Sequence, residues 1–259
     1  MDEETVRQRR RGRRAAAGAF GLALSAAGLV LAAPAARAQG DFTPEQRQAI
    51  IAILRDALRS DPSILRDAVA ALREAERRQR EGAAQAAIGA HGDALFRDPA
   101  DPVRGNPQGA VTVVEFFDAR CGYCKQLEPT LDQVLRQDPD VRLVLKDLPV
   151  LGPGSVLASR ALLAARRQGK YVELREAVMK LRGEPTEPAL RHAAEEVGID
   201  WAGLRRDMDD PAVARRIQDN LQLAQALQIQ GTPALVIGNQ LIPGAADRAR
   251  LEGAIAAAR

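Results

Sequence analysis

The amino-terminal part of the chain carries a basic stretch followed by an apolar one. Residues 7–14 are nearly all arginine, and residues 15–33 contain no charged side chain. Ala36 and Ala38 then provide the two small residues that a signal peptidase reads. A basic region, an apolar region and an A-x-A end in this order predict a secretory signal peptide over residues 1–38, cleaved on export.

The same segment allows two other interpretations. The apolar run of about 19 residues is just long enough to span a bilayer as an uncleaved membrane anchor. Its Ala and Gly content makes it only weakly hydrophobic, which favours cleavage. Arg13 and Arg14 resemble a twin-arginine export signal, but the alanines that follow fit that pattern poorly. We therefore expect export by the general secretory route and a mature protein in the periplasm.

Residues 42–81 have the hydrophobic spacing of two amphipathic helices. Apolar residues recur at helical spacing in both: Ile50, Ile51, Leu54 and Leu58, then Leu65, Val69 and Leu72. Thr43, Pro44 and Gln46 have the pattern of a capping box at the start of the first helix. Short helices cannot bury such stripes alone, so they pack on the main domain or on another chain. The Gly- and Ala-rich residues 82–92 are typical of a linker or a frayed helix end.

The next part of the chain has the pattern of a strand–helix–strand unit. Residues 111–117 are a near-continuous run of β-branched and aromatic residues, which predicts a strand buried on both faces. A CxxC motif at residues 121–124 leads into a helix-spaced stretch over residues 125–137, and residues 141–145 have the composition of a second strand. This order is a βαβ unit, so the two strands should be parallel.

The rest of the chain first loses and then regains strand character. Residues 153–228 are helical by pattern, with no strand signal. Residues 234–237 and 240–242 predict an antiparallel hairpin joined at Gly238-Asn239, and a short Ala-rich helix follows. The predicted fold class is therefore α/β, with a helical insertion inside a small domain and further helices before it.

The net charge of the mature chain differs in sign from that of the whole chain, because the predicted signal peptide is basic. The whole chain carries +3 and has a pI of about 9.2, which by itself indicates an anionic partner. Removal of residues 1–38 takes away seven of the 37 basic and three of the 34 acidic residues, which leaves a net charge of about −1. Aromatic residues make up only 3% of the chain, too few for stacking on single-stranded nucleic acid. We therefore expect no nucleic-acid partner.

The chain has two cysteines, Cys121 and Cys124, and they admit three interpretations. A structural disulfide across so short a loop stabilises a fold by only about 2 kcal/mol. A metal site lacks further ligands, because His91 and His192 lie far away in the sequence. A redox-active dithiol fits best, since Cys121 begins a helix whose dipole lowers the pKa of a thiol and makes it the attacking group. Cys124, one turn further in, is suited to resolve the mixed disulfide.

Two motifs together resemble a known family. The strand at residues 113–117 followed by Cys121-Gly122-Tyr123-Cys124 resembles the active-site segment of DsbA-like thiol–disulfide oxidoreductases, which have the thioredoxin fold. Gly231-Thr232-Pro233-Ala234, before the final hairpin, is similar to the family's cis-proline loop. The resemblance covers roughly residues 90–259 and includes the helical insertion at about residues 153–228.

The resemblance implies a thioredoxin-like domain over residues 91–259, preceded by a helical segment over residues 39–90 that could serve oligomerisation. It implies that Pro233 is cis and lies opposite the CxxC motif, and that Thr232 offers its backbone to an extended substrate. Glu115 matches the family's buried acid and is a candidate for proton transfer.

The dipeptide between the cysteines indicates whether the protein oxidises its substrates or isomerises and reduces their disulfides. Gly122-Tyr123 brings no positive charge to stabilise a thiolate, and it resembles the pair in dimeric isomerases of the DsbC type. Both residues, with Thr232 and Pro233, are candidate substrate-binding residues. The helices at residues 42–81 resemble in position the trimerising segment of ScsC-type proteins. The resemblance thus implies a periplasmic, oligomeric isomerase or reductase for exported cysteine-containing proteins, kept reduced by a DsbD-type membrane partner.

Two alternatives stay open. If the helices at residues 42–81 pack on their own domain, a monomeric DsbA-like oxidase with a DsbB-type membrane partner is the simpler hypothesis. A periplasmic Cu(I) carrier that uses both thiolates belongs to a different class, and no Met-rich or His-rich tract supports it. The redox interpretation requires no metal and no other cofactor.

Overall fold

The computed structural model describes residues 42–259. The predicted signal peptide over residues 1–38 lies outside the described residues. The packing of the chain separates two compact units, which divide after Ser60. No helix within residues 42–259 has the length and apolar character needed to cross a membrane.

Helix α1 (Pro44–Ser60) is the described helix of the first unit. The predicted capping box forms at its start, because the Gln46 N–H donates to Thr43 Oγ1 at 3.3 Å and the Thr43 N–H donates to Gln46 Oε1 at 2.9 Å. None of the residues of α1 is buried. Its apolar stripe is therefore open to solvent: Ile50, Ile51, Ile53, Leu54 and Leu58.

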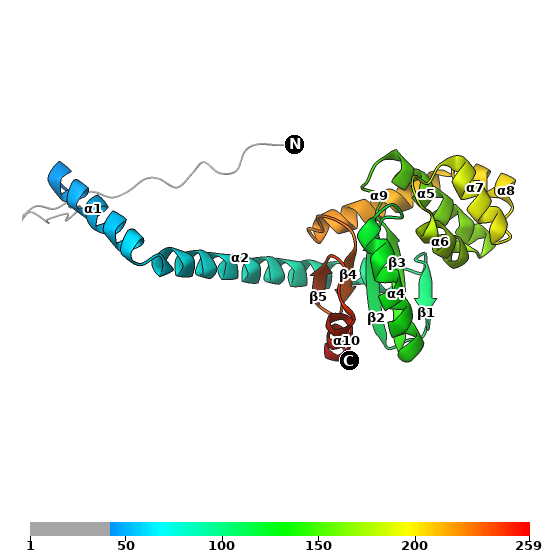
Figure 1. Ribbon diagram of the computed structural model, residues 1–259. Coiled ribbons are helices and arrows are strands. Elements are labelled where there is room, and N and C mark those ends of the chain that lie inside the picture. The colour runs from blue at the N-terminus through cyan, green and yellow to red at the C-terminus, as the bar shows by residue number, and fades with distance from the viewer. Residues whose placement is uncertain (1–41) are drawn as a thin grey trace, which may run out of the picture. The chain divides into compact units, whose positions relative to one another are not determined.

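The second unit is built on a five-stranded sheet with the order β1-β3-β2-β4-β5 (Figure 1). Its strands are β1 (Val103–Gly105), β2 (Val111–Phe117), β3 (Val141–Asp147), β4 (Ala234–Ile237) and β5 (Gln240–Pro243). Strands β2 and β3 are parallel, as the βαβ pattern predicts, and the other neighbouring pairs are antiparallel. The sequence did not predict β1, because three residues are too few to show a period. Its position is set by pairing with β3, where Val103 lies beside Val144.

Two apolar layers cover the two faces of the sheet, because alternate strand residues point to opposite sides. In this unit the helices outside the insertion are α2 (Ser63–Ala90), α3 (Gly92–Phe96), α4 (Gly122–Gln137) and α10 (Arg248–Ala257). Val113 and Leu143 belong to the layer shared with α4, α10 and the inserted helices. Val114 and Val144 belong to the other layer, which is shared with the inserted helix α9 (Pro211–Ala226), with α3 and with the end of α2.

Helix α2 continues through residues 82–90, where the Gly and Ala content predicted a linker or a frayed end. Ile88 is only 3% exposed and belongs to the same apolar layer as Leu95 and Leu223. Burial of this face stabilises the last turns of the helix, and alanine has the strongest intrinsic helix preference. The two glycines in the stretch are tolerated for these reasons.

The segment between β3 and β4 is helical, as its pattern predicts. Its elements are α5 (Pro153–Ala165), a short 3-10 helix (Arg166–Gln168), α6 (Tyr171–Lys180), α7 (Glu187–Glu196), α8 (Trp201–Asp207) and α9 (Pro211–Ala226). Three of these helices begin at side chains that accept backbone N–H groups of the first turn, namely Thr186, Asp200 and Asp210. Helices α5 to α8 form a group beside the sheet (Figure 1).

Candidate active site

Cys121 lies where the loop after β2 enters helix α4. Its backbone is extended and its carbonyl oxygen accepts the Lys125 N–H at 3.1 Å, so Cys121 is the N-cap residue. The CxxC motif therefore begins a helix behind a buried strand, as the sequence predicts. Both cysteines are free thiols; Cys121 is 6% exposed and Cys124 is completely buried. Of the two sulfurs, Cys121 Sγ is the one nearer the surface.

The loop before β4 supplies the facing side of the site. The peptide bond between Thr232 and Pro233 is cis. The Cys121 thiol donates to the carbonyl oxygen of Thr232, with 3.2 Å between sulfur and oxygen. Gly122 and Tyr123 are exposed in the first turn of α4, and Tyr123 keeps 65% of its surface open to solvent. The structure thus brings the two sequence motifs into direct contact beside an exposed tyrosine.

A buried ion cluster lies beneath the dithiol. Glu115 on β2 is completely buried, and its Oε2 accepts a hydrogen bond from Arg175 Nη2 at 2.8 Å. Arg175, also completely buried, donates to both oxygens of Glu128 at 2.7 and 2.9 Å. Arg104 also donates to Glu128 Oε2 at 3.0 Å, and the Arg175 guanidinium lies 4.2 Å from the centre of the Phe117 ring. The acid expected from the sequence is therefore one member of a charged network.

The environment of this cluster raises the pKa of three acid groups: Glu115, Asp147 and Cys124. Burial raises the pKa of Glu115 to about 7; the charge of Glu128 adds to the rise, and Arg175 opposes it. Burial also raises the pKa of Asp147 to about 7, against a 2.6 Å hydrogen bond from the Tyr171 hydroxyl. The pKa of the Cys124 thiol is raised by burial and then by the negative charge of Glu115. Glu115 can therefore exchange a proton near neutral pH, whereas Cys124 needs a base to ionise.

A family model described as a DSBA-like thioredoxin domain matches residues 112–256, more than half of the chain. The chain belongs to this family. Its fold is therefore the thioredoxin-like fold with a helical insertion that the sequence predicts.

Solved structures extend the similarity. A thioredoxin-like oxidoreductase from Silicibacter pomeroyi DSS-3 is 45% identical, with a TM-score of 0.63, over 64% of this chain and 96% of that one. A linker-deletion mutant of Proteus mirabilis ScsC is 28% identical, with a TM-score of 0.63, over 85% of this chain and 98% of that one. The similarity thus extends over nearly the whole length of both solved chains, and in the second case it covers more of this chain than the family domain does.

Curated relatives include proteins of a different kind. The Na(+)/H(+) antiporter NhaA 1 of Salinispora arenicola is 30% identical over 166 residues, which cover 62% of this chain and 26% of the antiporter. The chain spans about a quarter of the length of the curated antiporters it matches first. A probable thiol:disulfide interchange protein DsbC of Bordetella avium is 29% identical over 128 residues, covering 49% of this chain and 35% of that protein.

Two residues that organise the loops of this DsbA-like domain are not indicated by the sequence pattern. Asp118, just before the motif, is completely buried and accepts the N–H groups of Val150 and Leu151 at 2.9 and 3.0 Å. Arg120 binds the carbonyl oxygen of Leu151 and the carboxylate of Glu184. These contacts connect the cysteine loop to the segment after β3. No local sequence pattern predicts these contacts, because the bonded residues lie more than 30 positions apart in the chain.

The candidate ligands for a metal ion do not assemble. Within residues 42–259, no group of three or more His, Cys, Asp and Glu side chains has the arrangement of a metal site. His192 lies on the exposed surface, 3.4 Å from Glu196 within α7. Neither this side chain nor His91, at the start of α3, reaches the cysteines by any contact in the described chain.

Proposed function

We propose that the protein is a thiol–disulfide oxidoreductase that acts on exported cysteine-containing proteins through Cys121 and Cys124. The observation that carries the proposal is the 3.2 Å contact between Cys121 Sγ and the Thr232 carbonyl oxygen, with Cys124 buried behind it. An extended substrate segment that pairs with the backbone at Thr232 brings its own sulfur next to Cys121. Pro233, Gly122 and Tyr123 form the rest of this contact surface.

The exchange reaction balances on these residues. The Cys121 thiolate attacks one sulfur of a substrate disulfide, the substrate S–S bond breaks, and the released substrate thiolate takes up a proton. Cys124, after passing its proton to Glu115, attacks Cys121 Sγ and breaks the mixed disulfide. The second substrate sulfur leaves as a thiolate and takes up a proton, so the substrate leaves with both sulfurs reduced and the protein keeps a Cys121–Cys124 disulfide. In isomerisation a second substrate thiolate attacks the substrate sulfur of the mixed disulfide. A new substrate disulfide forms, and Cys121 leaves as a thiolate with no net electron transfer.

We further propose that the protein works as a homo-oligomer in the periplasm, as an isomerase or reductase recharged by a DsbD-type membrane partner. Apolar residues just before α1, on α1 and on the first half of α2 are exposed: Phe42, Ile50, Ile51, Ile53, Leu54, Leu58, Ile64, Leu65, Val69 and Leu72. A second copy of the chain offers matching stripes to cover them. The similarity to the Proteus mirabilis ScsC mutant covers 85% of this chain, against 67% for the catalytic domain of ScsC, which supports a shared N-terminal element.

Periplasmic localisation rests on two observations. The predicted signal peptide over residues 1–38 directs export. A structure described as a periplasmic thioredoxin-like protein from Salmonella enterica serovar Typhimurium is 36% identical, with a TM-score of 0.59, over 64% of this chain and 94% of that one. An oxidising compartment also supplies the substrate disulfides that the reaction needs.

The deciding experiment measures mass and isomerase activity together. Light scattering gives the mass of the mature protein, and refolding of scrambled ribonuclease gives the isomerase activity. We expect an oligomer that restores scrambled ribonuclease, and a monomer without that activity when Leu65→Glu and Leu72→Glu are combined. Arg66→Glu with Arg73→Glu is the matched control, because it places acidic residues with the same spacing on the polar positions of α2.

Three results would redirect the proposal. A monomeric mature protein that oxidises reduced substrates but leaves scrambled ribonuclease unchanged would identify the DsbA-like oxidase, with a DsbB-type partner. Loss of oligomerisation in the arginine control would show that charge, and not the apolar stripe, controls assembly. Tight stoichiometric Cu(I) binding by a reduced protein without exchange activity would identify the copper carrier.

A further inference from the structure

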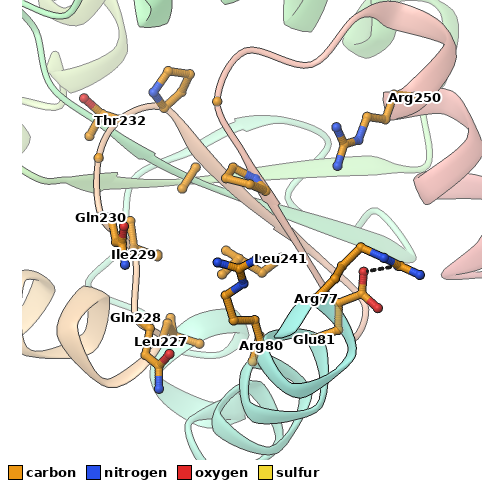
Figure 2. Close-up of a pocket in the computed structure, with 16 residues that line it drawn as sticks. Arg77, Arg80, Glu81, Leu227, Gln228, Ile229, Gln230, Thr232, Leu241 and Arg250 are labelled. Atoms are coloured by element: carbon orange, nitrogen blue, oxygen red, sulfur yellow. Dashed lines mark hydrogen bonds and ion pairs between the residues drawn. The ribbon is translucent and has the colours of Figure 1, made fainter. Parts of the chain in front are cut away.

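A groove of about 610 Å³ lies beside the cis-proline loop. One wall is the second half of α2, the opposite wall is the segment from Leu227 to Ala234, and β5 forms the floor (Figure 2). We propose that this groove binds an acidic, extended segment of the substrate protein next to its reacting cysteine. This inference rests on the proposed function, and it names the class of substrate that the same active site prefers.

The groove is continuous with the active site. Thr232 and Pro233 line it, and the carbonyl oxygen of Thr232 is the atom that contacts Cys121 Sγ at 3.2 Å. A polypeptide that pairs with the backbone at Thr232 therefore has one of its flanks directed into the groove. Strand β5, which also lines the groove, is the last strand of the sheet. The residues on one flank of the substrate cysteine therefore contact the groove, whereas the residues on the other flank do not.

Charge in the groove favours a negative ligand. Three arginines and one glutamate line it: Arg77, Arg80, Arg250 and Glu81. Arg77 is neutralised by Glu81 at 2.6 Å and by Glu74 at 2.7 Å. Within the described part of the chain, the side chains of Arg80 and Arg250 have no ion-pair or hydrogen-bond partner. Two free guanidinium groups therefore enter the groove from α2 and α10, as Figure 2 shows.

The form of the groove fits a peptide more closely than a small anion. Its remaining lining is largely apolar and includes Leu227, Ile229, Leu241 and Pro243. Arg80 and Leu241 both line the groove (Figure 2), so that a charged group and an apolar surface face the same space. An extended segment can place aliphatic stems on this surface and carboxylates against the two guanidinium groups. Such charge-assisted, often bidentate pairs are the ones that arginine forms best.

The pairing depends on α2, the helix that precedes the family domain. Arg80 lies about two turns before Ile88, whose buried side chain packs α2 against the sheet unit. A DsbA-like domain without this helix has the cis-proline loop but lacks one wall and one of the two free guanidinium groups. Helix α2 therefore contributes to substrate selection as well as to the assembly proposed above.

The test uses short disulfide-bonded peptides and the reduced, mature protein. In one peptide a run of Asp precedes the reacting cysteine, in a second the run follows it, and in a third Asn replaces Asp on both sides. The kcat/KM for each peptide is divided by the kcat/KM for a small aromatic disulfide, which has no peptide residues to enter the groove. We expect a preference for one Asp peptide of about 5- to 20-fold over the Asn peptide, decreasing as salt increases.

Matched variants connect the preference to the groove. Arg80→Ala with Arg250→Ala should reduce the preference to less than about twofold, because both free guanidinium groups are gone. Arg73→Ala with Arg206→Ala removes the same charge from two exposed positions outside the groove and should keep the preference. Equal rates for the Asp and Asn peptides would overturn the inference, and so would equal stimulation from both flanks or an unchanged preference in R80A/R250A. Failure of the wild type on the small disulfide would instead overturn the proposed function, and the inference with it.

Discussion

The thiol of Cys121 and the carbonyl oxygen of Thr232 lie 3.2 Å apart, although 111 residues separate them in the chain. Strand β2 ends shortly before Cys121 and β4 begins shortly after Thr232, and the two strands are neighbours, with Phe116 paired to Ala234. The pairing of β2 with β4 therefore places Cys121 Sγ beside the backbone of Thr232. The inserted helices lengthen the connection without separating the two motifs.

The unequal burial of the cysteines predicts which of them forms the mixed disulfide. Cys121 is 6% exposed and borders Thr232, whereas Cys124 is completely buried and burial raises the pKa of its thiol. Cys124→Ser should therefore accumulate a covalent complex with a substrate protein, because the resolving sulfur is absent. Cys121→Ser should form none. Non-reducing electrophoresis followed by mass spectrometry measures both, and an equal yield from the two variants would contradict the assignment.

The sequence indicates where these residues lie because the signals are local. A strand of β-branched residues, two cysteines at the start of a helix and a Thr-Pro before a hairpin each lie within a few residues. The parallel pairing of β2 and β3 follows from the same local order. The sequence therefore predicts most readily those side chains whose positions are set by the strand, helix or turn in which they lie.

Other features depend on contacts between distant elements, and the sequence did not predict them. Arg175 stands between Leu174 and Glu176 in a helix whose pattern is ordinary, yet it is completely buried against Glu115, 60 residues earlier. The Gly- and Ala-rich residues 82–90 have no strong apolar stripe, but burial of Ile88 against the sheet unit keeps them helical. In both cases tertiary packing determines what the side chain or segment does.

Glu115 should control the pH dependence of the resolving step. Burial raises its pKa from 4.5 to about 7, so its carboxylate becomes available to accept the Cys124 proton as pH increases through 7. Release of substrate from the mixed disulfide should therefore accelerate through this range in the wild type. In Glu115→Gln, release should be slower by about tenfold or more above pH 7, with no inflection near 7. Stopped-flow measurement of single-turnover release between pH 5 and 9 distinguishes the two.

The same residue should also influence folding stability, with a defined sign. Because the folded pKa of Glu115 is above the value of 4.5 expected for an exposed glutamate, the folded state holds the proton more tightly. Its contribution to stability is complete below pH 4.5 and is lost as pH increases through about 7. Asp147, whose pKa is also raised to about 7, adds a loss of the same sign. Urea unfolding of Glu115→Gln should therefore show a smaller decrease between pH 5 and 8, and Glu196→Gln, an exposed control, should behave like the wild type.

Arg175 should stabilise the domain by neutralising the buried carboxylate of Glu115 and the half-buried carboxylate of Glu128, which come from different elements. Its guanidinium reaches Glu115 on β2 and Glu128 on α4 from the inserted helix α6. Arg175→Met should reduce the free energy of unfolding by about 3–5 kcal/mol at pH 8, because both acids are then left without this partner. The loss should be smaller at pH 5, where Glu115 takes up a proton and loses its charge. Arg182→Met, at an exposed position after α6, should change stability by less than about 0.5 kcal/mol.

A second variant separates lost charge pairing from lost packing. Arg175 also lies 4.2 Å from the centre of the Phe117 ring, so the methionine changes the shape of the core as well as its charge. Combining Arg175→Met with Glu115→Gln and Glu128→Gln removes the uncompensated charges and leaves the packing defect in place. We expect this triple variant to recover at least half of the lost stability at pH 8 and to unfold almost independently of pH between 5 and 8, apart from the contribution of Asp147. If the triple variant were as unstable as Arg175→Met alone, packing against Phe117 would be the main role of Arg175, and the inserted helix would not control the charge beneath the dithiol.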